Sequence, residues 1–349
     1  MSLSFSTGQR PYIIAEIGAN HNGDIALARK MIEVANDMGC DAVKFQSWDE
    51  GLFAKVVYEE NKFLADDYRE RPDHSLETIM SEYKVTRGEM AELAQHCKKV
   101  GIHFSSTPFS CEQVDDLVTF GAPFVKIASM DLVSDYLLRH AARTGLPIVL
   151  STGFGTMEDI DHAVRTIEGE GNRQIVLLHC LALYPPPDED VNLANIDMLQ
   201  TAFGYPVGFS DHTLGTEIAL ASFARGSMML EKHFTLDKQM SGWDHKISSD
   251  VPEMAAICRG RDRIYAAIGV QRRTLSDAEL GRATEFRRSI VAARDIKKGE
   301  LIAAADITYR RPGRGLKPNH DQFVIGRIAA RDIAADDLLS WDDLSSATA

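Results

Sequence analysis

The sequence lacks the features that mark membrane, secreted and nucleic-acid-binding proteins. No apolar stretch approaches the ~20 residues of a membrane-spanning helix, and the opening MSLSFSTGQR has no apolar core of a signal peptide. The five cysteines are odd in number, lie far apart and form no CxxC motif, which argues against a disulfide framework or a zinc knuckle. A net charge of -13 argues against a nucleic-acid surface. We therefore expect a cytoplasmic protein that binds neither membranes nor nucleic acid.

What the chain has instead is a series of short apolar runs that each end in polar residues. Each run is short enough for a buried parallel strand, and helix-like segments separate the runs. They cover residues 13–16, 42–46, 102–107, 124–129, 147–152, 175–179, 207–212 and 228–233. This alternation predicts an α/β fold, a (β/α)8 TIM barrel. A typical barrel needs roughly 250 residues, so the chain of 349 residues leaves material for a second, smaller domain.

Helix start signals follow several of the runs. Asp24, Ser110 and Thr156 each precede an amphipathic segment, and Thr86 with Glu89 has the spacing of a capping box. The segment 48–81 is long and charged for a barrel loop, which predicts a lid or an oligomer contact.

The C-terminal part contains a duplication. VAARDIKKGELIAAADI, residues 291–307, returns as IAARDIAADDLLSWDDL, residues 328–344. Two short copies predict a small, pseudo-symmetric β-rich domain rather than a solenoid. The α/β alternation stops after Gly269, so we expect a barrel domain over 1–270, a polar linker over 271–288 and the small domain over 289–349. The basic turn 310–315 between the copies is, on its own, typical of a solvated loop.

The polar ends of the predicted strands indicate the site. In a (β/α)8 barrel these ends meet on one face, so their side chains would share one pocket. They are Glu16, Lys44, Gln46, Thr107, Lys126, Ser151, His212 and His233. Lys44 and Lys126 lie inside buried runs, where a lysine must find an anion or lose its proton. The set predicts a site for an anionic substrate and a metal.

His212 and His233 are the candidate metal ligands. They end the last two predicted strands, so adjacent strands bring two imidazoles to the same rim of the barrel. Neutral imidazole suits a first-row transition metal, and water with a substrate oxygen would complete an open octahedral site. Glu231 shares the strand face of His233 by the period-two rule. On the residues alone, a structural role for both histidines has about equal weight.

The order of the motifs resembles a known family. AEIGANHNGD, VKFQ, STPF, VKIAS, LSTG, HC followed by YP, SDHT and EKHFT resemble the bacterial sialic acid synthases, which make N-acetylneuraminate, legionaminate and pseudaminate. The resemblance covers nearly the whole chain, since the duplicated tail is similar to the C-terminal antifreeze-like SAF domain (β-clip) of these enzymes. It implies a metal-dependent condensation of phosphoenolpyruvate with an open-chain N-acylated hexose, giving a nine-carbon 2-keto acid and phosphate.

The resemblance also implies residue roles. His212 and His233 match ligands of a divalent metal, usually Mn²⁺, with Mg²⁺ or Co²⁺ as alternatives. The residues that match the phosphoenolpyruvate site are Lys44, Thr107, Lys126, Ser129 and Ser151, and those that match the sugar side are Glu16, Gln46, Tyr184, Asp244 and Arg311. Catalysis would fall to Lys44 and to Glu16 or Asp131, either of which could handle the attacking water. Arg311 matches an arginine that one subunit of a domain-swapped homodimer lends to its partner's barrel.

Three departures from the family pattern bear on the acceptor sugar. Asp131 stands where glutamate is common, Ala182 where asparagine is common, and Trp243 where proline is frequent. They leave the acceptor open between N-acetylmannosamine and a modified or 6-deoxy hexose. Another metal-dependent barrel enzyme, such as an aldolase or a sugar isomerase, is the alternative function, and a non-catalytic carbohydrate-binding protein is a second. Release of phosphate distinguishes a synthase from both.

Overall fold

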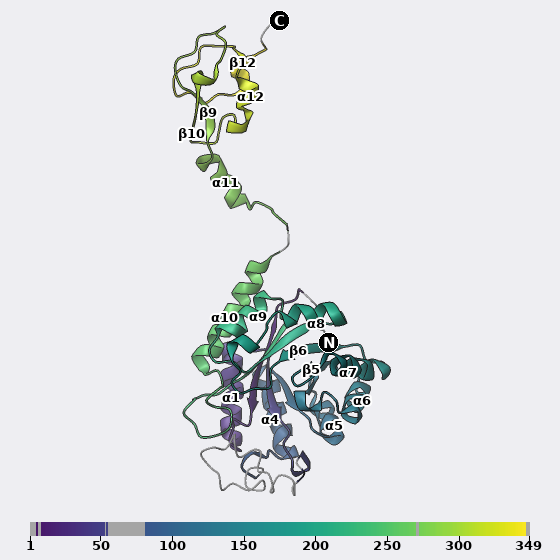
Figure 1. Ribbon diagram of the computed structural model, residues 1–349. Helices are drawn as coiled ribbons and strands as arrows, with labels where there is room; N and C mark the ends of the chain where they lie inside the picture. The colour runs from purple at the N-terminus through teal and green to yellow at the C-terminus, as the bar shows by residue number, and fades with distance from the viewer. Residues whose placement is uncertain (1–4, 6–7, 53, 55–80, 270–271, 347–349) are drawn as a thin grey trace. The chain divides into compact units, whose positions relative to one another are not determined.

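The computed structural model describes residues 5, 8–52, 54, 81–269 and 272–346. It divides into two compact units, Met1–Gly269 and Val270–Ala349, each with its own hydrophobic core (Figure 1). Most of the segment 48–81, which the sequence predicts to be a lid or an oligomer contact, lies outside the described residues. In the part of the chain that is described, no helix has both the length and the apolar composition needed to cross a membrane.

The described strands of the first unit form an 8-stranded parallel sheet, which confirms the predicted TIM barrel. The strands are β1 (Tyr12–Gly18), β2 (Ala42–Gln46), β3 (His103–Thr107), β4 (Val125–Ile127), β5 (Ile148–Ser151), β6 (Ile175–Cys180), β7 (Val207–Asp211) and β8 (Met229–His233). Their hydrogen-bonded order is β3-β2-β1-β8-β7-β6-β5-β4. β3 and β4, the two ends of this order, lie next to each other and nearly close the ring, and Ser105 Oγ donates to the carbonyl oxygen of Phe124 at 3.3 Å.

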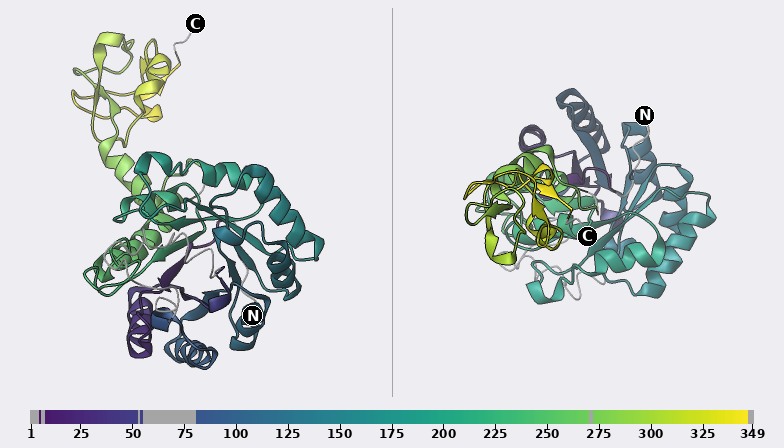
Figure 2. Two further views of the ribbon diagram at one scale, coloured as in Figure 1. Left: turned by 60° about the horizontal axis from the view of Figure 1, so that its bottom comes forward. Right: turned by 90° about the horizontal axis from the view of Figure 1, so that it is seen from above.

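Helices surround the strands, as Figure 2 shows for the first unit. They are α1 (Ile25–Met38), α4 (Arg87–Val100), α5 (Cys111–Phe120), α6 (Asp135–Arg143), α7 (Met157–Gly169), α8 (Asn195–Phe203), α9 (Glu217–Ala224) and α10 (Val251–Ile268). The predicted start signals are confirmed. Asp24 and Ser110 cap α1 and α5, while Thr86 and Thr156 form capping boxes with Glu89 and Asp159.

The lumen of the barrel has an apolar half and a polar half. The apolar half is filled by Ile14, Ala42, Phe124, Val149, Val176, Leu178, Met228 and Met229. Because side chains two residues apart point to the same face of a strand, the next lumen positions fall at the carboxyl ends. Those positions hold buried polar or charged residues. Glu16 lies two residues beyond Ile14, Lys44 beyond Ala42, Lys126 beyond Phe124, Ser151 beyond Val149 and Glu231 beyond Met229. The packed half thus supports a charged half above it.

The second unit is small and has short antiparallel ladders. Its elements are α11 (Asp277–Phe286), β9 (Ser289–Ala292), β10 (Ile307–Arg310), α12 (Asp321–Val324), β11 (Ile328–Ala329) and β12 (Leu344–Ser345). The duplication appears as a repeated contact. Arg294 Nε donates to Asp306 Oδ1 at 2.7 Å in the first copy, and Arg331 Nε donates to Asp343 Oδ1 at 2.6 Å in the second. Much of the region predicted as a linker, 271–288, is the helix α11.

Gly208 in β7 offers a test of barrel packing. A Cβ atom there would lie 2.6 Å from Leu178 Cδ2 and 2.6 Å from the carbonyl oxygen of Met229. We expect Gly208→Ala to lower the free energy of unfolding by about 1–3 kcal/mol, because a packed lumen cannot absorb a methyl group. Urea denaturation of the full chain measures it. The matched control is Gly88→Ala in α4, where a Cβ meets nothing within 4 Å and should be neutral or stabilising. Equal midpoints for Gly208→Ala and the wild type would contradict this packing.

Candidate active site

A buried cluster of two lysines and two glutamates lies at the carboxyl ends of the strands. Lys44 Nζ lies 2.5 Å from Glu16 Oε2 and 3.9 Å from Glu231 Oε2, and Lys126 Nζ lies 3.5 Å from Glu231 Oε1. Each of the four side chains is at most 8% exposed. The sequence predicts that each buried lysine either finds an anion or loses its proton, and the chain itself places two carboxylates beside them.

The two glutamates of this cluster have very different acidities. Burial raises the pKa of Glu16 to about 7, and the neighbouring Lys44 ammonium only partly opposes this. Burial also disfavours the charged form of Glu231, but Lys126 and Lys44 outweigh it and lower the pKa of Glu231 to about 2. Near neutral pH, Glu231 is therefore an anion while Glu16 can gain or lose a proton. Such a difference in pKa between two neighbouring carboxyl groups is typical of sites of acid–base catalysis.

Hydroxyl groups line the strand ends beside the lysines. Thr107 Oγ1 accepts a hydrogen bond from Lys44 Nζ at 2.6 Å. Ser129 Oγ accepts from the backbone N–H of Gly153 at 3.1 Å, and Gly153 has to be a glycine because a Cβ would lie 2.6 Å from that oxygen. Ser151 Oγ is buried and has no hydrogen-bond partner within the described residues. It is thus available to donate to a bound oxyanion.

His212 and His233 lie together, with ring centroids 5.5 Å apart. His212 Nδ1 lies 2.8 Å from the carbonyl oxygen of Leu181 and donates a hydrogen bond to it, which leaves Nε2 as the ring nitrogen that could bind a metal. Burial lowers the pKa of His233 to about 3, so its imidazole is neutral at physiological pH. His233 Nδ1 is buried, has no hydrogen-bond partner among the residues that the structure describes, and lies 3.6 Å from Asp244 Oδ2.

These two imidazoles fit a metal that takes its other ligands from water and substrate. Within the described ranges, no group of three or more His, Cys, Asp or Glu side chains could hold a metal. Neutral imidazoles are nevertheless the form that binds a first-row divalent ion, and the Leu181 carbonyl fixes one ring in the way typical of metal-binding histidines. Ligation by His212 and His233 stays a prediction.

The residues predicted for the sugar side adjoin the charged cluster. Gln46 Nε2 donates to Glu16 Oε1 at 3.2 Å, and Trp48 Nε1 donates to Gln46 Oε1 at 2.5 Å. The ring of Tyr184 lies over His212, with centroids 4.2 Å apart. Polar contacts thus run from Trp48 through Gln46 to Glu16 and Lys44.

A cluster of aromatic rings includes Trp243, the residue before Asp244, which is predicted to bind the sugar. Trp243 precedes Asp244, and its ring centroid lies 4.6 Å from that of Trp48 and 5.9 Å from that of Tyr83. Burial raises the pKa of Asp244 to about 6. The side of the site that carries Gln46 and Asp244 therefore combines hydrogen-bonding groups with apolar rings.

Within the described residues of the barrel, the predicted residue Asp131 is not joined to the cluster. Asp131 Oδ1 accepts from Ser134 Oγ at 2.9 Å, and in the described part of the chain no hydrogen bond or ion pair links Asp131 to either lysine. Arg311 belongs to the second unit, where its guanidinium lies 5.3 Å from the ring centroid of Phe286. Conversely, Glu231 lies at the centre of the cluster, although the sequence indicates only that it shares a strand face with His233. That two-residue spacing is the signal by which it could be found.

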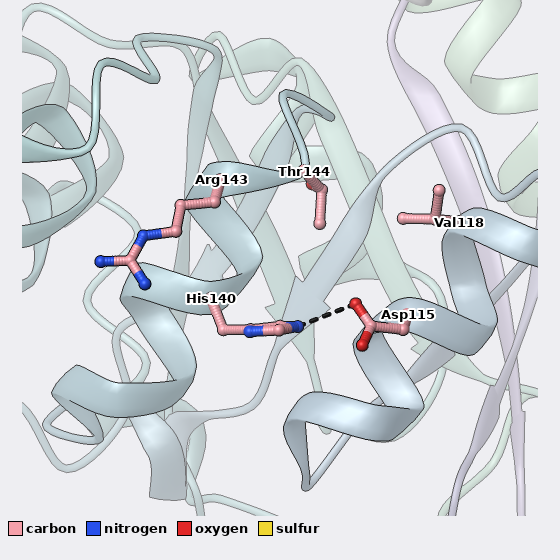
Figure 3. Close-up of a pocket in the computed structure, with 5 residues that line it drawn as sticks. All are labelled: Asp115, Val118, His140, Arg143 and Thr144. Carbon is pink, nitrogen blue, oxygen red and sulfur yellow. Dashed lines mark hydrogen bonds and ion pairs between the residues drawn. The ribbon is translucent and has the colours of Figure 1, made fainter.

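A separate hollow of about 330 Å³ lies between α5 and α6 (Figure 3). It is lined by Asp115, Val118, His140, Arg143 and Thr144, and His140 Nε2 contacts Asp115 Oδ1 at 2.8 Å. These residues lie in the later turns of two outer helices, which run back toward the amino ends of the strands. The hollow is therefore not part of the strand-end site.

Comparisons with known proteins agree with this geometry. The sequence model of the NeuB family matches residues 31–273, and that of the SAF domain matches 287–345. The chain is 37% identical to the N,N'-diacetyllegionaminic acid synthase of Campylobacter jejuni, over 95% of this chain and 99% of the relative. It is 30% identical to the pseudaminic acid synthase of Helicobacter pylori, over 96% and 98% of the two chains. Among solved structures, N-acetylneuraminic acid (sialic acid) synthetase from Leptospira borgpetersenii is similar with a TM-score of 0.69 and 31% identity, covering 79% of this chain and 90% of that one.

The lysine cluster predicts an anion-binding defect in a single variant. Lys126→Met removes a buried ammonium, so we expect inorganic phosphate to bind at least about thirtyfold more weakly, as measured by calorimetry. The control is Lys238→Met, which breaks the partly exposed contact of Lys238 with Glu253 away from the cluster and should leave phosphate affinity unchanged. Equal phosphate affinity in the two variants would remove Lys126 from the anion site.

Proposed function

The chain belongs to the NeuB family, and from that premise we propose that it is a synthase of the sialic acid type. It condenses phosphoenolpyruvate with an open-chain N-acylated hexose, giving a nine-carbon 2-keto sugar acid and phosphate. One observation carries the proposal: the buried cluster of Glu16, Lys44, Lys126 and Glu231 lies at the strand ends that also present His212 and His233. A site of this kind suits an anionic donor and a carbonyl acceptor.

The donor is held by the lysines and hydroxyls. Phosphoenolpyruvate is a trianion near neutral pH, and Lys44 and Lys126 provide fixed positive charge for its phosphate and carboxylate. Ser151 Oγ donates a hydrogen bond that it does not make within the described protein, and Thr107 and Ser129 add further oxygens. Because these groups are held in place before binding, they stabilise the departing phosphate without reorganisation.

His212 and His233 hold a divalent metal, with Mn²⁺ as the first candidate and Mg²⁺ or Co²⁺ as the next. Such a metal supplies Lewis acidity at the aldehyde oxygen of the sugar. The protein's part is to orient His212 and to keep the His233 imidazole neutral. The Leu181 carbonyl fixes the tautomer of His212, and burial suppresses protonation of His233. Tyr184 covers the ring of His212 and limits the approach of water from that side.

Glu16 rather than Asp131 handles the attacking water. The enol carbon of phosphoenolpyruvate bonds to the aldehyde carbon as the aldehyde C=O π bond opens, and water adds to the resulting cationic carbon. Phosphate then leaves with its carbon–oxygen bond broken, while the two protons of the water end on the former aldehyde oxygen and on the phosphate. A base must take one proton from that water. Glu16 lies against Lys44 and has a pKa of about 7, whereas Asp131 is turned toward Ser134. Its place in the lysine cluster favours Glu16.

The acceptor side favours a sugar with an apolar substituent. Gln46, Tyr184 and Asp244 provide hydrogen bonds to the acyl and hydroxyl groups, while Trp48 and Trp243 present rings beside them. A methyl group at C6 packs against such rings better than a hydroxyl does. We therefore propose a 6-deoxy diacetamido hexose as the preferred acceptor and N-acetylmannosamine as a weaker one. The names of the legionaminic and pseudaminic acid synthases among the relatives support this choice.

Arg311 completes the acceptor site from a second subunit. A guanidinium fork suits the acyl carbonyl and hydroxyls of the sugar. The working form would then be a domain-swapped homodimer in which each barrel receives Arg311 of the other chain.

A phosphate-release assay tests the proposed function. The full-length protein is incubated with phosphoenolpyruvate, Mn²⁺ and one of three sugars: a 6-deoxy diacetamido hexose, N-acetylmannosamine or unmodified mannose. We expect one phosphate per nine-carbon acid formed, the highest kcat/KM with the 6-deoxy sugar and no product with mannose. Chelation should abolish turnover, and added Mn²⁺ should restore it. Carbon–carbon bond formation without phosphate release would indicate an aldolase instead.

The pH dependence distinguishes Glu16 from Asp131. A base must be ionised to act, so kcat/KM should fall about tenfold per pH unit below a midpoint near 7 and level off above it. Glu16→Gln should remove this limb together with most of the activity. The matched variant Asp131→Asn should keep the limb. If the fall of kcat/KM at low pH disappeared in Asp131→Asn and persisted in Glu16→Gln, Asp131 would be the base instead.

A further inference from the structure

A fully buried ion pair that the proposed mechanism does not use lies next to the two histidines. Lys232 Nζ lies 2.7 Å from Asp211 Oδ2, and their side chains are 1% and 0% exposed. The two residues are register partners on neighbouring strands β7 and β8. Asp211 directly precedes His212, and Lys232 directly precedes His233.

The pair lies on the outer face of the sheet, behind the site. Side chains alternate along a strand, so Asp211 and Lys232 point away from the lumen that Glu231 and His233 face. Two observations agree with this assignment. On the inner face, Ser210 Oγ donates to Glu231 Oε1 at 3.2 Å, and on the outer face Leu230 belongs to the core between strands and helices.

The pair also holds the backbone on both sides of His212. Asp211 Oδ1 accepts hydrogen bonds from the backbone N–H of Thr213 at 2.8 Å and from Thr213 Oγ1 at 2.7 Å. Lys232 Nζ donates to the carbonyl oxygen of Thr213 at 2.6 Å. Residues 211–213 are thus closed into a tight turn that is bonded to β8 one residue before His233.

This arrangement fixes geometry more than it adds stability. A buried ion pair is often no more stabilising than apolar side chains of the same size, because both charges lose their hydration. What it provides is a short, directional link between two strands at one defined level. Together with the backbone hydrogen bonds between β7 and β8, this ion pair limits how far the strand ends that carry His212 and His233 can move relative to each other.

We propose that the Asp211–Lys232 pair is a positioning element that fixes the relative placement of the His212 and His233 imidazoles for a shared divalent metal. The inference rests on the metal site in the proposed function. Neither residue touches the metal or a substrate, and both act through the backbone of the histidine beside them. Outer partners of this kind commonly change metal affinity by ten- to a hundredfold, roughly.

The test is a calorimetric Mn²⁺ titration of the full chain with three variants. Asp211→Asn and Lys232→Met each remove one charge at nearly constant size, and we expect Mn²⁺ to bind about ten- to a hundredfold more weakly. In the double variant no unpaired charge is left buried, so thermal stability without metal should recover relative to the single variants while Mn²⁺ affinity stays low. In kinetic assays, saturating Mn²⁺ should restore much of kcat. The double variant keeps the test decisive if a single variant fails to fold.

The matched control is another ion pair of the barrel. Arg261 Nη1 lies 2.6 Å from Asp41 Oδ2, and the two side chains are 1% and 21% exposed. Asp41 precedes β2 and also accepts from the backbone N–H of Ile13, at the amino ends of the strands. Arg261→Met should therefore lower thermal stability and leave Mn²⁺ affinity unchanged.

The possible results distinguish the positioning role of the Asp211–Lys232 pair from the metal site of the proposed function. Wild-type Mn²⁺ affinity in Asp211→Asn, Lys232→Met and the double variant, with lowered thermal stability, would make the pair merely structural and overturn the inference. An equal loss of Mn²⁺ affinity in Arg261→Met would overturn it as well, because any destabilisation would then suffice. Failure of the wild-type chain itself to bind Mn²⁺ would overturn the metal site in the proposed function, and the positioning role with it.

Discussion

The candidate site depends on the mutual neutralisation of four charged side chains inside the barrel. Removing an ion from water costs several kcal/mol even after relaxation, so Lys44 and Lys126 are tolerated in the lumen only because Glu16 and Glu231 accompany them. The lysines stabilise the charged forms of the two glutamates to different degrees. Glu231 lies between both lysines and stays ionised, whereas Glu16 faces one lysine from a fully buried position and titrates near neutral pH. The same constraint that keeps the barrel folded therefore creates one fixed anion and one exchangeable proton.

The two-residue period of the strands is what allows the barrel to carry this cluster. Ile14, Ala42 and Phe124 fill one level of the lumen with apolar contacts, and the next level on the same faces holds Glu16, Lys44 and Lys126. The lower level excludes water and fixes the strand spacing. Because the charged groups stand on rigid strands rather than on loops, their separations are set before any ligand binds, which is the condition for strong electrostatic stabilisation.

Local signals explain how much of this the sequence could predict. Strand positions and the caps at Asp24 and Thr86 follow from short patterns, and strand ends in a barrel converge by topology, so Lys44, Lys126 and the two histidines could be grouped without coordinates. The ion pairs could not be predicted. The link from Asp211 to Lys232 depends on the register between β7 and β8, and the direction of Asp131 depends on a single 3₁₀ turn, Ser129–Asp131. Neither leaves a mark in a single sequence.

Charge balance connects the proton on Glu16 to the metal at the histidines. With all four charged residues ionised the cluster is neutral, and a trianionic donor alone would leave a buried site strongly negative. Protonation of Glu16 together with a divalent cation at His212 and His233 brings the occupied site to neutrality. Phosphoenolpyruvate and the metal should therefore each bind more tightly when the other is present, since coupling between two ligands is reciprocal. Glu16 must lose that proton before it can accept one from water, so donor binding favours its protonated form and water activation its ionised form. A pKa near 7 keeps both forms populated near neutral pH.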